Sequence, residues 1–151
     1  MFDRSKIKAS GQVHLQVISP NGELKEERKI KNLVVDDGLD YISSRMKDAT
    51  ATAMSHMEVG TGTTSPVAGD TTLETAIVGS RVALTSTTVT SNAIEYIGDF
   101  PAGTGTGAIT EAGIFNASSA GTLLCRTTFA VVNKGAADTL KITWTVTVSD
   151  S

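Results

Sequence analysis

The sequence is poor in cysteine, aromatic residues and charge. A single cysteine among 151 residues excludes a disulfide within the chain, and nothing indicates an oxidising, secretory context. Aromatic residues make up 5% and charged residues 19% of the chain, and no apolar run approaches the roughly 18 residues that a membrane helix needs. No charged segment followed by an apolar stretch opens the sequence, as it would in a signal peptide. We therefore expect a soluble protein that is made in the cytoplasm and has no membrane partner.

Threonine, glycine, alanine and serine are abundant instead. Threonine suits a half-buried pleated strand, and glycine supplies the positive φ angles of tight turns, so this composition favours an all-β protein with many turns. The length fits one domain with a sizeable core. We expect an N-terminal arm at residues 1–11 and a single domain at 12–151.

Several segments alternate between apolar and polar residues, the period expected of strands with one buried face. The clearest is "TLKITWTVTV" at 139–148, and "QVHLQV" at 12–17 follows the same pattern. Pro20-Asn21-Gly22 predicts a turn that makes the first two strands a hairpin, and 60–74 reads as a long ordered loop. Such alternation predicts an antiparallel β-sandwich of about eight strands. The expected strands are 12–17, 24–35, 56–60, 81–90, 92–100, 107–116, 122–132 and 139–148.

One segment, 36–47, changes to helical spacing. Its apolar residues Leu39, Ile42 and Met46 lie at i, i+3 and i+7, with an aspartate pair at the start and basic residues at the end. We expect a short helix there, capped by one of the aspartates and placed against an edge of the sheet.

Positive charge is concentrated near the N-terminus. Residues 1–31 hold seven Lys and Arg against four Asp and Glu, which leaves a net charge of −6 on the rest of the chain. Three explanations are open: nucleic-acid contact, a solvated strand face, or an arm docked on an acidic neighbour. The segment lacks the interleaved aromatic residues of a nucleic-acid stacking platform. We therefore expect no nucleic-acid partner, and we expect Arg4, Lys6 and Lys8 to anchor the arm on a neighbouring subunit.

Residue patterns that would hold a cofactor or a metal ion are weak. The Gly-rich runs 60–64 and 103–107 lack the Gly-Lys-Ser/Thr ending of a phosphate loop and read as turns. His56 and Glu58 share a strand face, but zinc needs at least a third protein ligand; the only other histidine is His14, and Cys125 lies in an apolar strand. We expect no metal and no cofactor.

Catalytic groups are no better supported. Cys125 lies in the apolar segment "TLLCRTTF" and reads as a core or interface residue rather than a nucleophile. Glu95, Asp99 and Glu111 could in principle supply the two carboxylates of a glycosidase, but no aromatic sugar platform accompanies them. We expect the protein not to be an enzyme.

Glu111 stands out because it lies in the strand segment "ITEAGIFN". By simple alternation it shares a face with Ile109 and Phe115. A carboxylate there must lie near a rim of the sheet or accept hydrogen bonds, for which the backbone N–H groups of a Gly-rich corner are suitable donors. We expect Glu111 to be a structural latch, whose loss lowers stability and removes no activity.

Three stretches resemble small virion proteins of tailed bacteriophages. They are "KNLVVDDGLDYISSRM" at 31–46, "MEVGTGTTSPVAGDTTLETAI" at 57–77 and "GAITEAGIFNASSAGTLLCRTTFAVVNKGAADTLKITWTVTV" at 107–148. The shared features are a G-T-G-T-T-x-P loop, an I-T-E-x-G-[IL]-F strand and a final strand with alternating threonines. Similar strands also occur in the particle-attachment parts of phage tail fibres.

The resemblance implies a non-enzymatic β-sandwich that binds other virion proteins as a homo-oligomer, often a homotrimer. It implies a head decoration or cement protein that binds the major capsid protein and stabilises the shell. The alternative is a tail or neck fibre or adaptor protein that attaches virion parts to one another. Either role places the protein in the virion after synthesis in the cytoplasm of the host bacterium.

Overall fold

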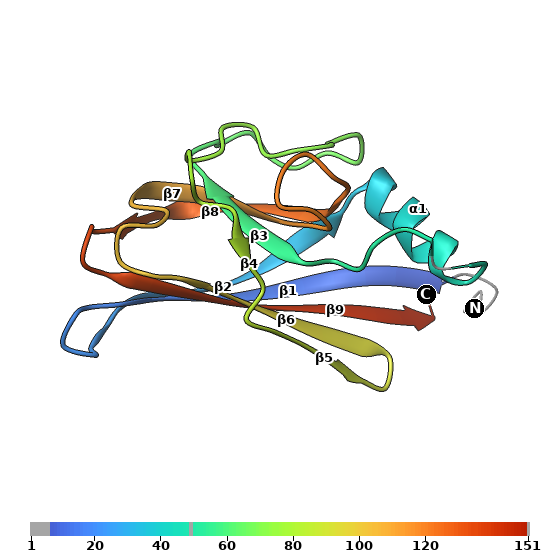
Figure 1. The fold of residues 1–151 in the computed structure, drawn as a ribbon, viewed down its shortest axis with the longest axis horizontal. Helices are drawn as coiled ribbons and strands as arrows, with labels where there is room; N and C mark the ends of the chain where they lie inside the picture. The colour runs from blue at the N-terminus through green and yellow to red at the C-terminus, as the bar shows by residue number, and fades with distance from the viewer. Residues whose placement is uncertain (1–6, 49, 151) are drawn as a thin grey trace.

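The computed structural model describes residues 7–48 and 50–150, and this part of the chain is mainly β (Figure 1). Nine strands form one sheet in the order β4-β3-β7-β8-β2-β1-β9-β6-β5, and every neighbouring pair is antiparallel. The strands are β1 (Ile7–Ile18), β2 (Leu24–Val34), β3 (His56–Gly60), β4 (Val82–Ala83), β5 (Ser86–Thr90), β6 (Ala93–Phe100), β7 (Gly107–Phe115), β8 (Leu123–Lys134) and β9 (Thr139–Asp150). The expectation of a mainly antiparallel β fold with one short helix is confirmed.

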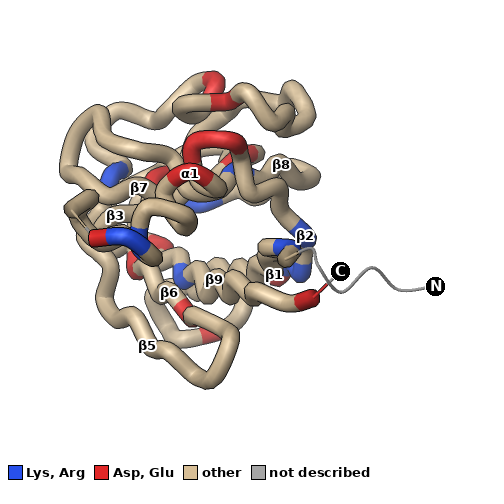
Figure 2. The backbone as a smooth tube through the Cα atoms, turned by 90° about the vertical axis from the view of Figure 1, so that its right-hand side faces the viewer, with Lys and Arg blue, Asp and Glu red and all other residues tan. Residues whose placement is uncertain are grey.

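The sheet curls so that its two halves face each other across the core. Figure 2 shows β1, β2, β6 and β9 on one side and β3, β7 and β8 on the other. Strand β2 joins the halves, because most of its length pairs with β1 while only Leu33 and Val34 pair with β8. The expectation was about eight strands in two packed sheets, whereas the structure has nine strands in one curled sheet.

The ninth strand arises because segment 81–90 is divided between the two halves. Strand β4 pairs with β3, and β5 pairs with β6. Between them, the Leu84 N–H donates to the Ser55 carbonyl and the Thr85 N–H donates to the Ile97 carbonyl, each at 2.8 Å. Two consecutive residues thus bond to opposite halves, and this crossing ends one strand and begins the next.

The core follows the alternation seen in the sequence. In β9, Leu140, Ile142 and Trp144 are buried, and their polar neighbours face outward. Strands β1 and β6 contribute in the same way, since their alternate residues lie opposite those of β9 in the sheet. A second, smaller cluster lies on the far side of β7 and consists of Val35, Leu73, Phe115 and Leu123.

The turn between the first two strands has the geometry that the sequence predicts. The Gly22 N–H donates to the Ser19 carbonyl at 2.9 Å, and Gly22 has a φ of 87°, in the left-handed region that favours glycine. The predicted hairpin of β1 and β2 is confirmed.

Strand β1 begins earlier than expected. It starts at Ile7, which pairs with Asp150 at the end of β9, so residues 7–11 belong to the sheet and the arm boundary at residue 11 is wrong. Lys8 pairs with Ser149 in the same ladder. Arg4 and Lys6 lie outside the described residues.

Helix α1 (Asp36–Arg45) forms where it was expected, but its start differs from the prediction. Its N-cap is Val35, which makes no side-chain capping bond, whereas one of the aspartates was expected to cap it. Asp36 and Asp37 lie in the first turn, where a negative charge interacts favourably with the helix dipole.

The buried face of α1 also differs from the expected one. Ile42 packs against the core as expected, but Leu39 and Met46 are 43% and 85% exposed, and Tyr41 packs against the core in their place. Gly38 permits the close approach, because a Cβ at this position would lie 2.0 Å from the Leu124 carbonyl oxygen of β8. The contact with β8, which helical spacing cannot reveal, decides which face of the helix is buried.

Candidate functional site

Glu111 lies on β7 beneath the loop of residues 61–75, and its side chain is 0% exposed. The pairing of β7 with β8 shifts register between Ile109 and Glu111. As a result Ile109 and Ala112 both join the main core, while Glu111 bonds to the loop on the other side of the strand. The expectation that Glu111 shares a face with Ile109 is therefore wrong, because simple alternation fails at a bulge.

Both carboxylate oxygens of Glu111 accept hydrogen bonds from several donors. Oε1 accepts from the backbone N–H groups of Gly62 at 3.0 Å and Thr75 at 2.7 Å. Oε2 accepts from the Glu74 N–H at 3.0 Å and from Nε of Arg126 at 2.9 Å. Three of these donors lie at the two ends of loop 61–75, so one side chain fastens both ends of the loop to the sheet.

Arg126, on β8, supplies the positive charge of this site and is 2% exposed. Its Nη2 lies 2.8 Å from Oε2 of Glu111, and its Nη1 donates to Oδ2 of Asp70 at 3.0 Å. Asp70 also accepts a hydrogen bond from the Val67 N–H at 3.0 Å. The guanidinium group therefore links the strand carboxylate to the middle of the loop.

Two glycines allow the loop to approach Glu111 so closely. A Cβ at Gly60 would lie 2.5 Å from Oε1 of Glu111, and a Cβ at Gly62 would lie 2.6 Å from the same atom. The sequence patterns assigned this Gly-rich run to turns and gave no role to Arg126, which follows Cys125 in "TLLCRTTF". The available signal was a lone arginine in an otherwise apolar strand segment, which calls for a buried acid as its partner.

Glu74 fixes the loop internally. Its Oε1 accepts hydrogen bonds from the backbone N–H groups of Thr63 at 3.1 Å and Thr64 at 3.4 Å. Hydrogen bonds from the Thr64 hydroxyl and the Thr63 backbone lower the pKa of the Glu74 carboxyl. The charged form of Glu74 is thus the form that holds the loop.

The three acids considered for sugar hydrolysis are not brought together. Glu95 and Asp99 are exposed on β6, in the half of the sheet opposite to β7. Asp99 accepts a hydrogen bond from the Thr85 hydroxyl at 2.7 Å, whereas Glu111 is enclosed under loop 61–75. The arrangement gives no pair of carboxylates flanking a common space.

The candidate metal ligands have other partners. Oε1 of Glu58 lies 3.1 Å from Nη2 of Arg81, and Nδ1 of His56 lies 2.7 Å from the Ser55 hydroxyl. His14 is on the outer face of β1, with Nε2 3.1 Å from Glu27 of β2. Among the described residues, no group of three or more His, Cys, Asp or Glu is arranged to hold a metal ion.

Cys125 is fully buried on β8 and belongs to the main core. Burial raises the pKa of its thiol well above the usual value. The reactive thiolate form is therefore disfavoured, in agreement with the expected core role.

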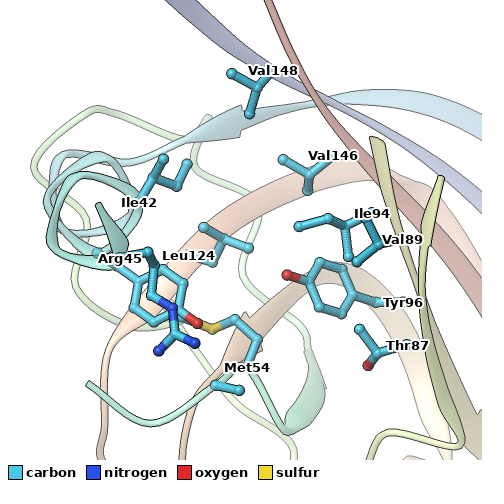
Figure 3. A pocket seen from close by; sticks show the side chains of 12 residues that line it. Ile42, Arg45, Met54, Thr87, Val89, Ile94, Tyr96, Leu124, Val146 and Val148 are labelled. Atoms are coloured by element: carbon cyan, nitrogen blue, oxygen red, sulfur yellow. The ribbon is translucent and has the colours of Figure 1, made fainter. Parts of the chain in front are cut away.

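An apolar pocket of about 390 Å³ lies between α1 and the ends of β5, β6 and β9 (Figure 3). Val89 and Thr87 of β5 and Tyr96 of β6 form one wall, and Met54 and Arg45 lie across from them. Burial raises the pKa of the Tyr96 hydroxyl well above its usual value. The pocket lining is mainly apolar, and Arg45 supplies a charged group at its wall.

The Glu111 site is therefore a structural arrangement: its charges bond to the loop and to each other, and its carboxylate is closed to solvent.

Within the described residues, no helix is long and apolar enough to cross a membrane. Comparison with protein families, with curated proteins and with solved structures finds no match to this chain.

Proposed function

We propose that the protein is a non-catalytic structural component of a tailed-phage virion, namely a head decoration or cement protein that binds and stabilises the capsid shell. The proposal begins from the resemblance of residues 31–46, 57–77 and 107–148 to small virion proteins of tailed phages. A decoration protein must present a stable shape to many copies of a capsid protein, and it needs no perturbed catalytic group.

One observation supports the proposal most directly. The loop and the strand that carry the resemblance form a single unit, because Glu111 of "ITEAGIF" accepts hydrogen bonds from the backbone N–H groups of Gly62, Glu74 and Thr75, all within the segment 57–77. Glu111 is the buried member of the three acids that were considered for catalysis, and it holds a surface loop in place. Such a loop presents fixed backbone and threonine groups to a partner protein.

The location is tested by imaging purified particles that carry a labelled copy of this protein. A head decoration protein should give many labels distributed over the shell. Few labels confined to the tail or neck would instead establish the alternative, a fibre or adaptor protein, and would refute the assignment to the head.

Attachment is tested by removing the basic N-terminal residues. Because β1 begins at Ile7, the deletion should stop at residue 6 so that the sheet stays intact. We expect the shortened protein to fold and to lose attachment to particles. A variant in which the charges of Arg4 and Lys6 are reversed should behave in the same way. Reversal of Lys47, whose side chain is exposed near the end of α1, is the matched control. Unchanged attachment of the shortened protein would contradict the proposed anchoring role.

A further inference from the structure

The two edge strands of the sheet, β4 and β5, differ in length and therefore in how much unpaired backbone they offer to another strand. At one end of the strand order, β4 has two residues; at the other end, β5 has five residues, Ser86–Thr90. In an antiparallel strand, alternate residues direct their N–H and C=O groups away from the paired neighbour. Strand β5 is paired with β6 on one side, and no described strand pairs with its other side.

Strand β5 has none of the usual protections of an exposed edge. Such edges are commonly protected by lysines, prolines, bulges or very short length. The segment 82–94, which contains β5, has no charged residue, no proline and no glycine. Its register with β6 runs without a break from Ser86 to Thr90. This edge is therefore a regular, uncharged template for another strand.

The inner face of β5 is also uncovered. Thr87 and Val89 lie opposite Tyr96 and Ile94 of β6, so their side chains face the apolar pocket, as Figure 3 shows. Val89 is nevertheless 68% exposed. A strand added at this edge would cover Val89 and extend the pocket wall with its own inward side chains.

We propose that β5 pairs antiparallel with β5 of a second copy of this chain, about a two-fold axis at Thr88. A two-fold interface must be self-complementary, and an uncharged strand meets its own copy without like charges facing each other. In this register each Thr88 lies opposite the other Thr88, and each Val89 lies opposite Thr87 of the second copy. The apolar side chain of one copy thus reaches the pocket wall of the other.

This inference is independent of the proposed role in a virion, since it follows from the edge and its composition alone. It also differs from the homotrimer that the resemblance implies, because two-fold pairing of one edge closes with two chains. The mass of the assembly in solution therefore distinguishes the proposed dimer from a homotrimer.

The register is tested by cysteine cross-linking of the full chain. Directly opposed residues of antiparallel strands have Cα atoms about 4.5 to 5.5 Å apart, within the range of a disulfide. We expect Thr88→Cys to form a covalent dimer under mild oxidation, while the buried Cys125 does not react. Thr90→Cys is the register control, because residue 90 lies opposite Ser86 of the second copy. Equal cross-linking of the two variants would overturn the proposed register.

The strength of the pairing is tested by sedimentation equilibrium. The unmodified chain should be a dimer at high concentration, and Thr88→Lys should weaken dimerisation about fivefold or more, since it places two ammonium groups opposite each other. Thr139→Lys, an equally charged change at an exposed residue of β9, should leave it unchanged. A monomer at all concentrations up to about 1 mM, or a trimeric mass, would overturn the proposal.

Discussion

Loop 61–75 and strand β5 are both at the surface, but their backbone polar groups differ in whether they find partners within the described chain. Glu111 and Arg126 bond the loop to the sheet from within the same chain. Strand β5 has one backbone edge without a neighbouring strand in the described chain. We therefore expect the loop region to serve stability and the β5 edge to serve association. Substitutions in the first should change unfolding, and substitutions in the second should change the assembly state.

The largest effect is expected for Glu111→Ala. Removal of one partner from a buried ion pair costs about 3 to 5 kcal/mol, because the other charge is left buried without compensation. Here Arg126 would keep only Asp70 as an acidic partner, and the N–H groups of Gly62, Glu74 and Thr75 would lose their acceptor. We expect a loss of this size in the free energy of unfolding, measured by urea denaturation.

Two further variants sharpen this prediction. Glu111→Gln keeps one carbonyl acceptor for the loop but removes the charge that pairs with Arg126. Its free energy of unfolding should therefore fall less than that of Glu111→Ala. Glu95→Ala, at an exposed residue of β6, should change stability by less than about 0.5 kcal/mol. If Glu111→Ala unfolds no more easily than Glu95→Ala, the structural role assigned to Glu111 is wrong.

The next largest effect is expected for Gly62→Ala. The added Cβ would lie 2.6 Å from Oε1 of Glu111, so either the loop or the carboxylate must move, and overpacking of this kind costs about 1 to 3 kcal/mol. Gly69→Ala in the same loop is a matched control, because a Cβ there has no atom within 4 Å. Thermal unfolding of the two variants should separate them, and equal melting temperatures would argue against the close packing.

Stability should also fall in acid. Hydrogen bonds from Thr64 and Thr63 lower the pKa of Glu74, and Lys25 and the Gly135 N–H lower the pKa of Asp138. A carboxyl group whose pKa is lowered by folding stabilises the protein above its unfolded pKa, and this contribution is lost as the pH falls through the folded pKa. We expect unfolding to become easier below about pH 4.

Amide variants test the source of this acid dependence. Glu74→Gln and Asp138→Asn should each flatten the change of unfolding free energy with pH below neutrality. Glu74 acts within loop 61–75, whereas Asp138 acts between β8 and β9, so the two contributions should be additive. An unchanged pH dependence in both variants would contradict the assignment.

The smallest effect on stability is expected at β5. Thr88→Lys changes an exposed residue of the edge strand and should alter the unfolding free energy of the monomer by less than about 0.5 kcal/mol. Urea denaturation at low protein concentration measures this value without a contribution from association. A large loss of unfolding free energy would show that β5, like the loop region, serves stability, and would contradict the contrast between β5 and the loop region.

The sequence by itself determined the class of fold and most strand positions. Alternation in β9 and β1 reports which residues are buried, because successive side chains in a strand point to opposite faces. The turn at Gly22 was equally predictable, since its positive φ is a local property of the chain. The need of Glu111 for hydrogen-bond donors was also predictable from its place in an apolar strand, whereas its burial was only one of two possibilities.

Only the tertiary structure decided how these elements are joined. The division of 81–90 into β4 and β5 depends on the carbonyl groups of Ser55 and Ile97, which lie in opposite halves of the sheet. The pairing of Arg126 with Glu111 and the side of β7 that carries Glu111 depend on the register of β7 with β8, where a bulge interrupts the alternation. Local periodicity reports whether a side chain is buried, but its partners depend on the register of the strands and on the loops that pack against them.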